Sequence, residues 1–198
     1  MAGETAHAKG ADGTWRAKRW LERTTRADVR WMQPDPAAIP KLTFPKPNGS
    51  FSFDLGGLLR GGEVHNQEFF AEVKNYKDAS DQPAHYRDFL AKCFRAYSMR
   101  PERCDHFMWI TWSPFNATEW SKLDSADKVK LCVRERWQFN FASEQEAAGS
   151  TLDSRMIKEV AERIWVLVLS DKQINHLSMS DENLAVIAMH EVLEGARK

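Results

Sequence analysis

Three residues in the first half of the chain could together hydrolyse a phosphodiester bond: Asp54, Glu72 and Lys74. Carboxylate oxygens are the ligands that Mg²⁺ and Mn²⁺ prefer in proteins. Such an ion lowers the pKa of a bound water and neutralises charge on the phosphate. A lysine beside the carboxylates could orient that water or stabilise charge in the transition state. The chemistry requires a fold that brings the three side chains together.

The residues before Lys74 have the pattern of a strand. Period-two alternation places Glu72 and Lys74 on one face, and the other face carries the apolar residues Phe69, Ala71 and Val73. The triplet is the one acid-x-Lys element in the chain, although composition alone predicts about two. A solvated strand face with a weak ion pair would explain the same pattern.

A hairpin would bring Asp54 to this strand. A preceding strand is indicated by Phe51, Phe53 and Leu55, and the pair Gly61-Gly62 supplies a turn between the two. If the hairpin is centred near Glu63, Asp54 and Glu72 lie nine residues on either side and face each other. Their Cβ atoms would then be about 5 Å apart, which suits two ligands of one ion. The alternative is that Asp54 caps a turn at Gly56-Gly57.

With these motifs the chain resembles the PD-(D/E)xK nuclease superfamily over roughly residues 13–112. Asp54 stands for the motif aspartate, Glu72 for the acid and Lys74 for the lysine. Gln82 and Tyr86 match the Gln-x-x-x-Tyr element of RecB-like members. No proline precedes Asp54, and Glu22 is the candidate for the glutamate often found on the first helix of these enzymes.

The resemblance implies an α/β fold of the restriction-endonuclease type, a mixed central sheet flanked by helices. It implies a catalytic set of Asp54, Glu72, Lys74, Gln82 and Tyr86. It also implies that Asp54, Glu72 and Val73 hold Mg²⁺ or Mn²⁺. Alternatively, Gln82 and Tyr86, one helical turn apart, fix their helix to the sheet.

Charge is distributed unevenly along the chain. Residues 1–103 carry 17 Lys and Arg against 13 Asp and Glu, whereas residues 104–198 carry 11 against 15. A basic half that contains the candidate site suits a nucleic-acid enzyme, and the acidic half could dock a protein partner. The candidate phosphate-binding residues are Arg16, Arg19, Arg23, Arg87 and Arg95. Trp112 and Trp120 could stack on bases, although a place in the core is the simpler interpretation.

The remaining sequence predicts one domain. Residues 1–12 are expected to be flexible, and residues 13–198 to form a single nuclease-like unit with a C-terminal helical extension from about 171. We expect helices over 13–27, over 117–136 and over 152–163, strands over 29–32, 105–112 and 165–169, and a loop over the proline-rich residues 33–50. A further helix is expected to be capped by Ser80 or Asp81, with Pro83 in its first turn and an apolar stripe of Tyr86, Leu90, Cys93, Phe94 and Tyr97. Trp20, Trp109 and Trp165 are expected in the core, and Trp15 is expected as an apolar anchor of the first helix.

Three dispersed cysteines without a CxxC pair predict neither a disulfide framework nor a zinc site. With no apolar leader and no long apolar run, we expect a cytoplasmic protein without a membrane span. The sequence therefore predicts a Mg²⁺- or Mn²⁺-dependent deoxyribonuclease of the kind used in restriction, phage defence or repair. The alternative is a non-catalytic DNA-binding or scaffold protein on the same fold.

Overall fold

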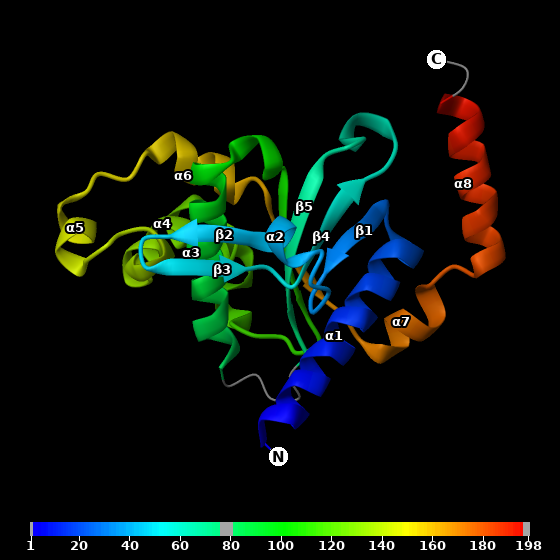
Figure 1. The fold of residues 1–198 in the computed structure, drawn as a ribbon, viewed down its shortest axis with the longest axis horizontal. Coiled ribbons are helices and arrows are strands. Elements are labelled where there is room, and N and C mark those ends of the chain that lie inside the picture. The colour runs from blue at the N-terminus through cyan, green and yellow to red at the C-terminus, as the bar shows by residue number, and fades with distance from the viewer. Residues whose placement is uncertain (1, 76–80, 196–198) are drawn as a thin grey trace.

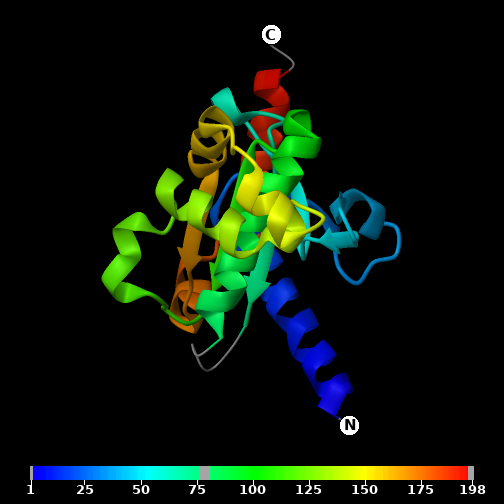
Figure 2. The same ribbon diagram turned by 90° about the vertical axis from the view of Figure 1, so that its left-hand side faces the viewer.

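The computed structural model describes residues 2–75 and 81–195 and has a mixed central sheet with helices on both faces (Figures 1 and 2). The sheet order is β1-β4-β5-β6-β7. Its strands are β1 (Ala27–Met32), β4 (Leu55–Leu59), β5 (Glu68–Lys74), β6 (His106–Thr111) and β7 (Ile164–Val168). Neighbouring strands are antiparallel from β1 to β5 and parallel from β5 to β7. The expected α/β class with a mixed, helix-flanked sheet is confirmed.

Each face of the sheet has its own apolar cluster. Helix α1 (Ala2–Thr24) packs on one face, where Ala17 and Leu21 join the odd-numbered residues of β5. The other face is covered by α3 (Gln82–Met99), α4 (Ala126–Glu135) and α6 (Ser154–Ala161). Helix α3 begins after Asp81 with Pro83 in its first turn, and its predicted apolar stripe is buried: Tyr86, Leu90, Cys93, Phe94 and Tyr97. The predicted helix and its buried stripe are thus confirmed.

The proline-rich segment is structured, contrary to the predicted loop. It contains α2 (Ile39–Leu42), β2 (Thr43–Lys46) and β3 (Gly49–Ser52), and the two strands form a separate small sheet. Phe44 and Phe51 of this hairpin pack on Phe53 in the core. The prediction of one strand through Phe51, Phe53 and Leu55 was therefore wrong, because the chain leaves the small sheet at Phe53 to bury that ring.

Other boundaries also differ from the predictions. Helix α1 starts at Ala2, so the residues expected as a flexible arm continue the helix. The helix expected over 117–136 is divided into the 3-10 helix η3 (Ala117–Lys122) and α4. The remaining short helices are η1 (Gly62–Val64), η2 (Pro101–Arg103), η4 (Trp137–Phe139) and α5 (Glu144–Gly149).

Trp15, expected as an apolar anchor, and Trp165, expected in the core, lie at the surface. Trp15 is 58% exposed on α1, and Trp165 is 49% exposed because β7 is an edge strand. Trp109, on the central strand β6, is fully buried as predicted, and Trp20 packs partly buried against the α1-side cluster. The three cysteines are buried and form no disulfide.

The C-terminal segment forms α7 (Asp171–Leu177) and α8 (Asp181–Gly195). Both lie on the α1 side, and α8 extends away from the sheet (Figure 1). Arg16 and Arg23 of α1 form ion pairs with Asp171 and Asp181, which join this segment to the body. Within the described ranges, the structure has no helix with both the length and the apolar character needed to cross a membrane.

Candidate active site

The predicted hairpin register is present in the structure. Strands β4 and β5 pair Leu55 with Ala71, and the Asp54 amide donates to the Ala71 carbonyl at 3.0 Å. Asp54 lies directly before β4, and its carboxylate reaches the backbone of β5 at Val73, next to Glu72. The site lies where β4 begins and β5 ends, and its Glu72 side chain is on the side of the sheet that α3 covers.

Asp54 is held by the backbone of the neighbouring strand. Its Oδ2 accepts a hydrogen bond from the Val73 amide at 2.7 Å. The N–H and C=O of one strand residue point to the same edge of that strand. The Val73 carbonyl therefore faces the same edge as Asp54, which is where a third oxygen ligand would be needed.

Glu72 and Lys74 lie on the opposite face of β5 from Ala71 and Val73, as the alternation predicted. The Lys74 Nζ donates to Glu72 Oε1 at 2.8 Å. The side chains of Glu72 and Lys74 are only 8% and 13% exposed. A solvated strand face with a weak surface ion pair, the alternative open at the sequence level, does not describe this buried pair.

A second lysine reaches the same carboxylate. Lys92, on α3, has its Nζ at 3.2 Å from each oxygen of Glu72, and its side chain is 16% exposed. Sequence reasoning missed this residue. A signal was present, because Lys92 interrupts the apolar run from Phe89 to Phe94, and a buried lysine needs a partner.

The pKa values of the Asp54 and Glu72 carboxyl groups are shifted in opposite directions. Burial and the neighbouring charge of Glu72 raise the pKa of Asp54 to about 6. Burial also opposes ionisation of Glu72, but the charges of Lys92 and Lys74 outweigh it and lower the Glu72 pKa. Glu72 is thus held as a carboxylate over a wide pH range, while Asp54 takes up a proton near neutrality.

The Gln-x-x-x-Tyr element connects α3 to its surroundings. Tyr86 is fully buried, packs edge-on against Trp109, and donates its hydroxyl to the Leu123 carbonyl at 2.9 Å. Gln82 is also fully buried, and its Oε1 accepts from the Thr111 hydroxyl on β6. These contacts match the structural alternative, in which the pair fixes the helix to the sheet. The Gln82 Nε2 has no hydrogen-bond partner among the described residues.

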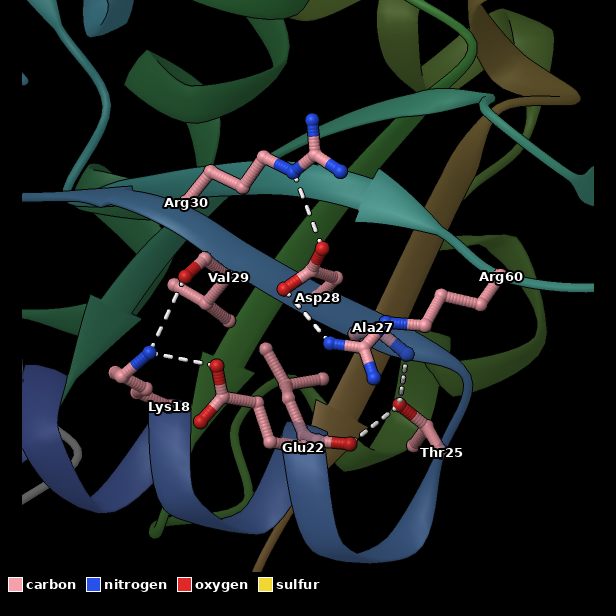
Figure 3. Close-up of polar contacts among 9 residues, drawn as sticks. Lys18, Glu22, Thr25, Ala27, Asp28, Val29, Arg30 and Arg60 are labelled. Carbon is pink, nitrogen blue, oxygen red and sulfur yellow. Dashed lines mark hydrogen bonds and ion pairs between the residues drawn. The ribbon is translucent and has the colours of Figure 1, made fainter. Parts of the chain in front are cut away.

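Glu22 lies outside the site. Its carboxylate accepts from Lys18 at 2.6 Å, and Lys18 also donates to the Val29 carbonyl on β1. Figure 3 shows this pair beside Asp28, which binds both Arg30 and Arg60. These charged side chains lie along β1, an edge strand of the sheet, and charged side chains on an edge strand disfavour its pairing with another chain. The structure therefore assigns Glu22 to the edge of the sheet.

The arginines expected to bind phosphate are mostly paired within the chain. Arg16 and Arg23 bind the C-terminal aspartates, Arg87 lies 3.4 Å from Glu135, and Arg95 donates to the Pro45 carbonyl. Arg16 also stacks over Trp112, with its guanidinium carbon 4.7 Å from the ring centroid. Trp112 is thus half-buried under an arginine, whereas Trp120 is exposed.

The donor atoms suit a hard divalent cation. Asp54 and Glu72 supply carboxylate oxygens, and the Val73 main chain offers a carbonyl on the same edge. No cluster of three or more acidic, histidine or cysteine side chains suitable for a metal occurs in the described part of the chain. An ion here would therefore have two carboxylates and depend on main-chain and solvent oxygens for the rest of its shell, which is common for Mg²⁺.

Comparison with known proteins does not identify a family. No protein-family model matches the chain, and no curated protein matches it. Among solved structures, the Cap4 SAVED/CARF-domain containing receptor of Moraxella osloensis aligns with 84% of this chain at 10% identity and a TM-score of 0.36. The chain spans about a third of that protein, since 33% of its length is covered. Similarity this weak carries no argument about fold or function.

Proposed function

We propose that this protein is a metal-dependent nuclease that hydrolyses DNA phosphodiester bonds on a restriction-endonuclease-like fold. The proposal depends on one observation above all. Asp54, directly before β4, accepts a hydrogen bond from the Val73 amide of β5, and on the same strand Lys74 lies on the Glu72 carboxylate. Asp54 and Lys74, 20 positions apart in the sequence, thereby lie in one small site at the end of the sheet.

The proposed ion is Mg²⁺ or Mn²⁺, held by Asp54, Glu72 and the Val73 carbonyl. When bound, it would neutralise phosphate charge and lower the pKa of a water. The protein contributes pre-organisation, because the Val73 amide fixes Asp54 before any ligand arrives. Ammonium groups in a site of low exposure stabilise developing negative charge more strongly than they would in water. Lys74 is the residue best placed for that role.

The basic first half of the chain supports DNA as the substrate class. Arg19 is exposed on α1, and the neighbouring Arg16 and Arg23 form their ion pairs with aspartates that are themselves exposed. Phosphate groups can displace such partners, because exposed ion pairs are weak. For binding of this kind, log K should fall linearly with log[salt], with a slope of about −0.9 per phosphate contact on duplex DNA.

The contact of Lys92 with Glu72 supports a second candidate function. With two lysines on Glu72, the cluster is already neutralised without a metal. That arrangement also suits a non-catalytic DNA-binding or scaffold protein in which Glu72 is purely structural. The two functions differ in whether the protein binds a divalent ion at Asp54.

Cleavage of plasmid and single-stranded DNA with Mg²⁺ or Mn²⁺ tests the proposal. The wild type should cut and Asp54→Asn should not, whereas the matched surface variant Asp127→Asn should cut like the wild type. Asp127 is exposed on α4 and lies in no part of the site. No cleavage by the wild type with any of these ions and substrates would favour the non-catalytic function. Equal cleavage by Asp54→Asn would remove Asp54 from the mechanism.

A further inference from the structure

Lys92 occupies an unusual position on the Glu72 carboxylate. Its Nζ is equally distant from Oε1 and Oε2, at 3.2 Å from each, whereas the Lys74 Nζ binds Oε1 at 2.8 Å. An ammonium that straddles both oxygens lies where a cation would bind the carboxylate in a bidentate manner. Lys74, bound to one oxygen, leaves that position to Lys92.

The number of acceptor sites on Glu72 limits where a metal ion could bind this carboxylate. A carboxylate offers about four lone-pair sites on two oxygens. The two lysines occupy both sites of Oε1 and one of Oε2. A metal ion shared with Asp54 can therefore reach Glu72 through the remaining site on Oε2, and it does so close to the Lys92 ammonium.

Charge repulsion makes that arrangement unfavourable. The Glu72 and Lys92 side chains are 8% and 16% exposed, so solvent screens their interactions poorly. A divalent cation that approaches Glu72 meets the positive charge of Lys92 at short range. Either the ion binds weakly or Lys92 withdraws from the carboxylate when the ion arrives.

We propose that Lys92 is the resident cation of Glu72 in the metal-free protein, and that it competes directly with the divalent ion for this carboxylate. Lys92 then sets the metal concentration at which the site loads, and metal entry displaces its ammonium. The inference rests on the proposed function, since it presupposes that a metal binds at Asp54 and Glu72. It adds a positioning residue from α3, outside the strands that carry the acid-x-Lys element.

Calorimetric titration of Mn²⁺ into the wild type and Lys92→Met tests the competition. Methionine keeps much of the length of the side chain but removes its charge. We expect Mn²⁺ to bind Lys92→Met about ten-fold more tightly, within the 5–150-fold range of couplings between linked sites. Lys92→Arg retains the charge and should not tighten binding. Lys130→Met is the matched control, an exposed lysine on α4, and should bind like the wild type.

A second measurement uses the unaltered protein, in case Lys92→Met fails to fold. Reductive methylation, followed by mass spectrometry of peptides, reports how accessible the Lys92 amine is. Mn²⁺ should increase methylation of Lys92 but not of Lys130.

The outcomes separate the two proposals. Equal or weaker Mn²⁺ binding by folded Lys92→Met, or a Lys92 amine that stays equally protected in metal-saturated protein, would overturn the competition while leaving the nuclease proposal intact. Absence of Mn²⁺ binding by both wild type and Lys92→Met would overturn the metal site itself, and the inference with it.

Discussion

Two groups of ion pairs in this molecule have similar residues but opposite surroundings. At the sheet end, Glu72 is bound by Lys74 and Lys92, and all three side chains are largely buried. Between α1 and the C-terminal helices, Arg16 and Arg23 bind Asp171 and Asp181, whose side chains are 77% and 79% exposed. The first group is part of the candidate site and is largely buried, and the second lies on the surface.

The difference shows why proximity of charges alone does not reveal their role. Exposed pairs contribute about 0–1 kcal/mol and are screened by salt. A buried pair contributes little net stability as a whole, but removing one member leaves an uncompensated buried charge. The buried cluster should therefore be fragile to single substitutions and insensitive to salt, and the surface pairs should be the reverse.

Removal of Glu72 should have the largest effect on stability. Glu72→Ala leaves two buried ammonium groups without their carboxylate, so unfolding free energy should fall by about 3–5 kcal/mol. Urea denaturation measures the loss, and Glu135→Ala, which truncates a more exposed glutamate paired to Arg87, should cost less than about 1 kcal/mol. Equal losses of unfolding free energy in Glu72→Ala and Glu135→Ala would show that burial does not determine the cost of removing a paired glutamate.

Lys74→Ala should affect catalysis most among the lysine substitutions. Loss of a group that stabilises transition-state charge typically slows the reaction by about 10²–10³-fold. Mn²⁺ binding should survive, because a protonated lysine ligates no metal. A cleavage time course beside a calorimetric titration measures both properties. If metal binding disappears together with activity, Lys74 acts only through Glu72 and the catalytic role is wrong.

Asp54→Asn should stabilise the protein at alkaline pH. The folded-state pKa of Asp54, about 6, lies above its value of 3.8 in an unfolded chain. Stability from this group is therefore full below about pH 4 and is lost as the pH rises through 6. Asparagine removes that loss, so Asp54→Asn should be more stable than the wild type by about 3 kcal/mol at pH 8. Denaturation at pH 8 and pH 4 measures the difference, which should shrink at the lower pH; a variant less stable than wild type at pH 8 would contradict the assigned burial.

The smallest effects should come from the surface pairs. Replacing both Asp171 and Asp181 by asparagine should change unfolding free energy by less than about 1 kcal/mol per pair. The freed arginines should increase duplex affinity several-fold at low salt, and the gain should fade as salt rises. Fluorescence anisotropy with labelled duplex, at two salt concentrations, checks this. An affinity that falls in the double variant would assign these aspartates a different role.

The sequence predicted the local geometry of the site well. Period-two alternation placed Glu72 and Lys74 on one face of β5, and symmetry about Glu63 predicted the register in which β4 pairs with β5. Both predictions depend only on the regular repeat of strands and on a short hairpin. The buried stripe of α3 followed in the same way from helical spacing.

What the sequence did not predict depends on contacts between distant segments. The Lys92–Glu72 contact joins residues on a helix and a strand, and periodicity within either element cannot reveal it. The small β2–β3 sheet was missed because its prolines indicated a loop, whereas burial of Phe44 and Phe51 stabilises strands there. Trp165 was assigned to the core because WVLVL reads as buried, but β7 is the edge strand.

The most direct test of the account is the cleavage rate of a labelled duplex as a function of Mn²⁺ concentration. For the wild type, the rate should saturate with Mn²⁺ and be half-maximal at the Mn²⁺ concentration that half-fills the site in calorimetry. It should vanish with a chelator, and Asp54→Asn should remain inactive at every concentration. Cleavage by the wild type that persists with chelator, or that Asp54→Asn retains in full, would contradict a metal-dependent site at Asp54 and Glu72.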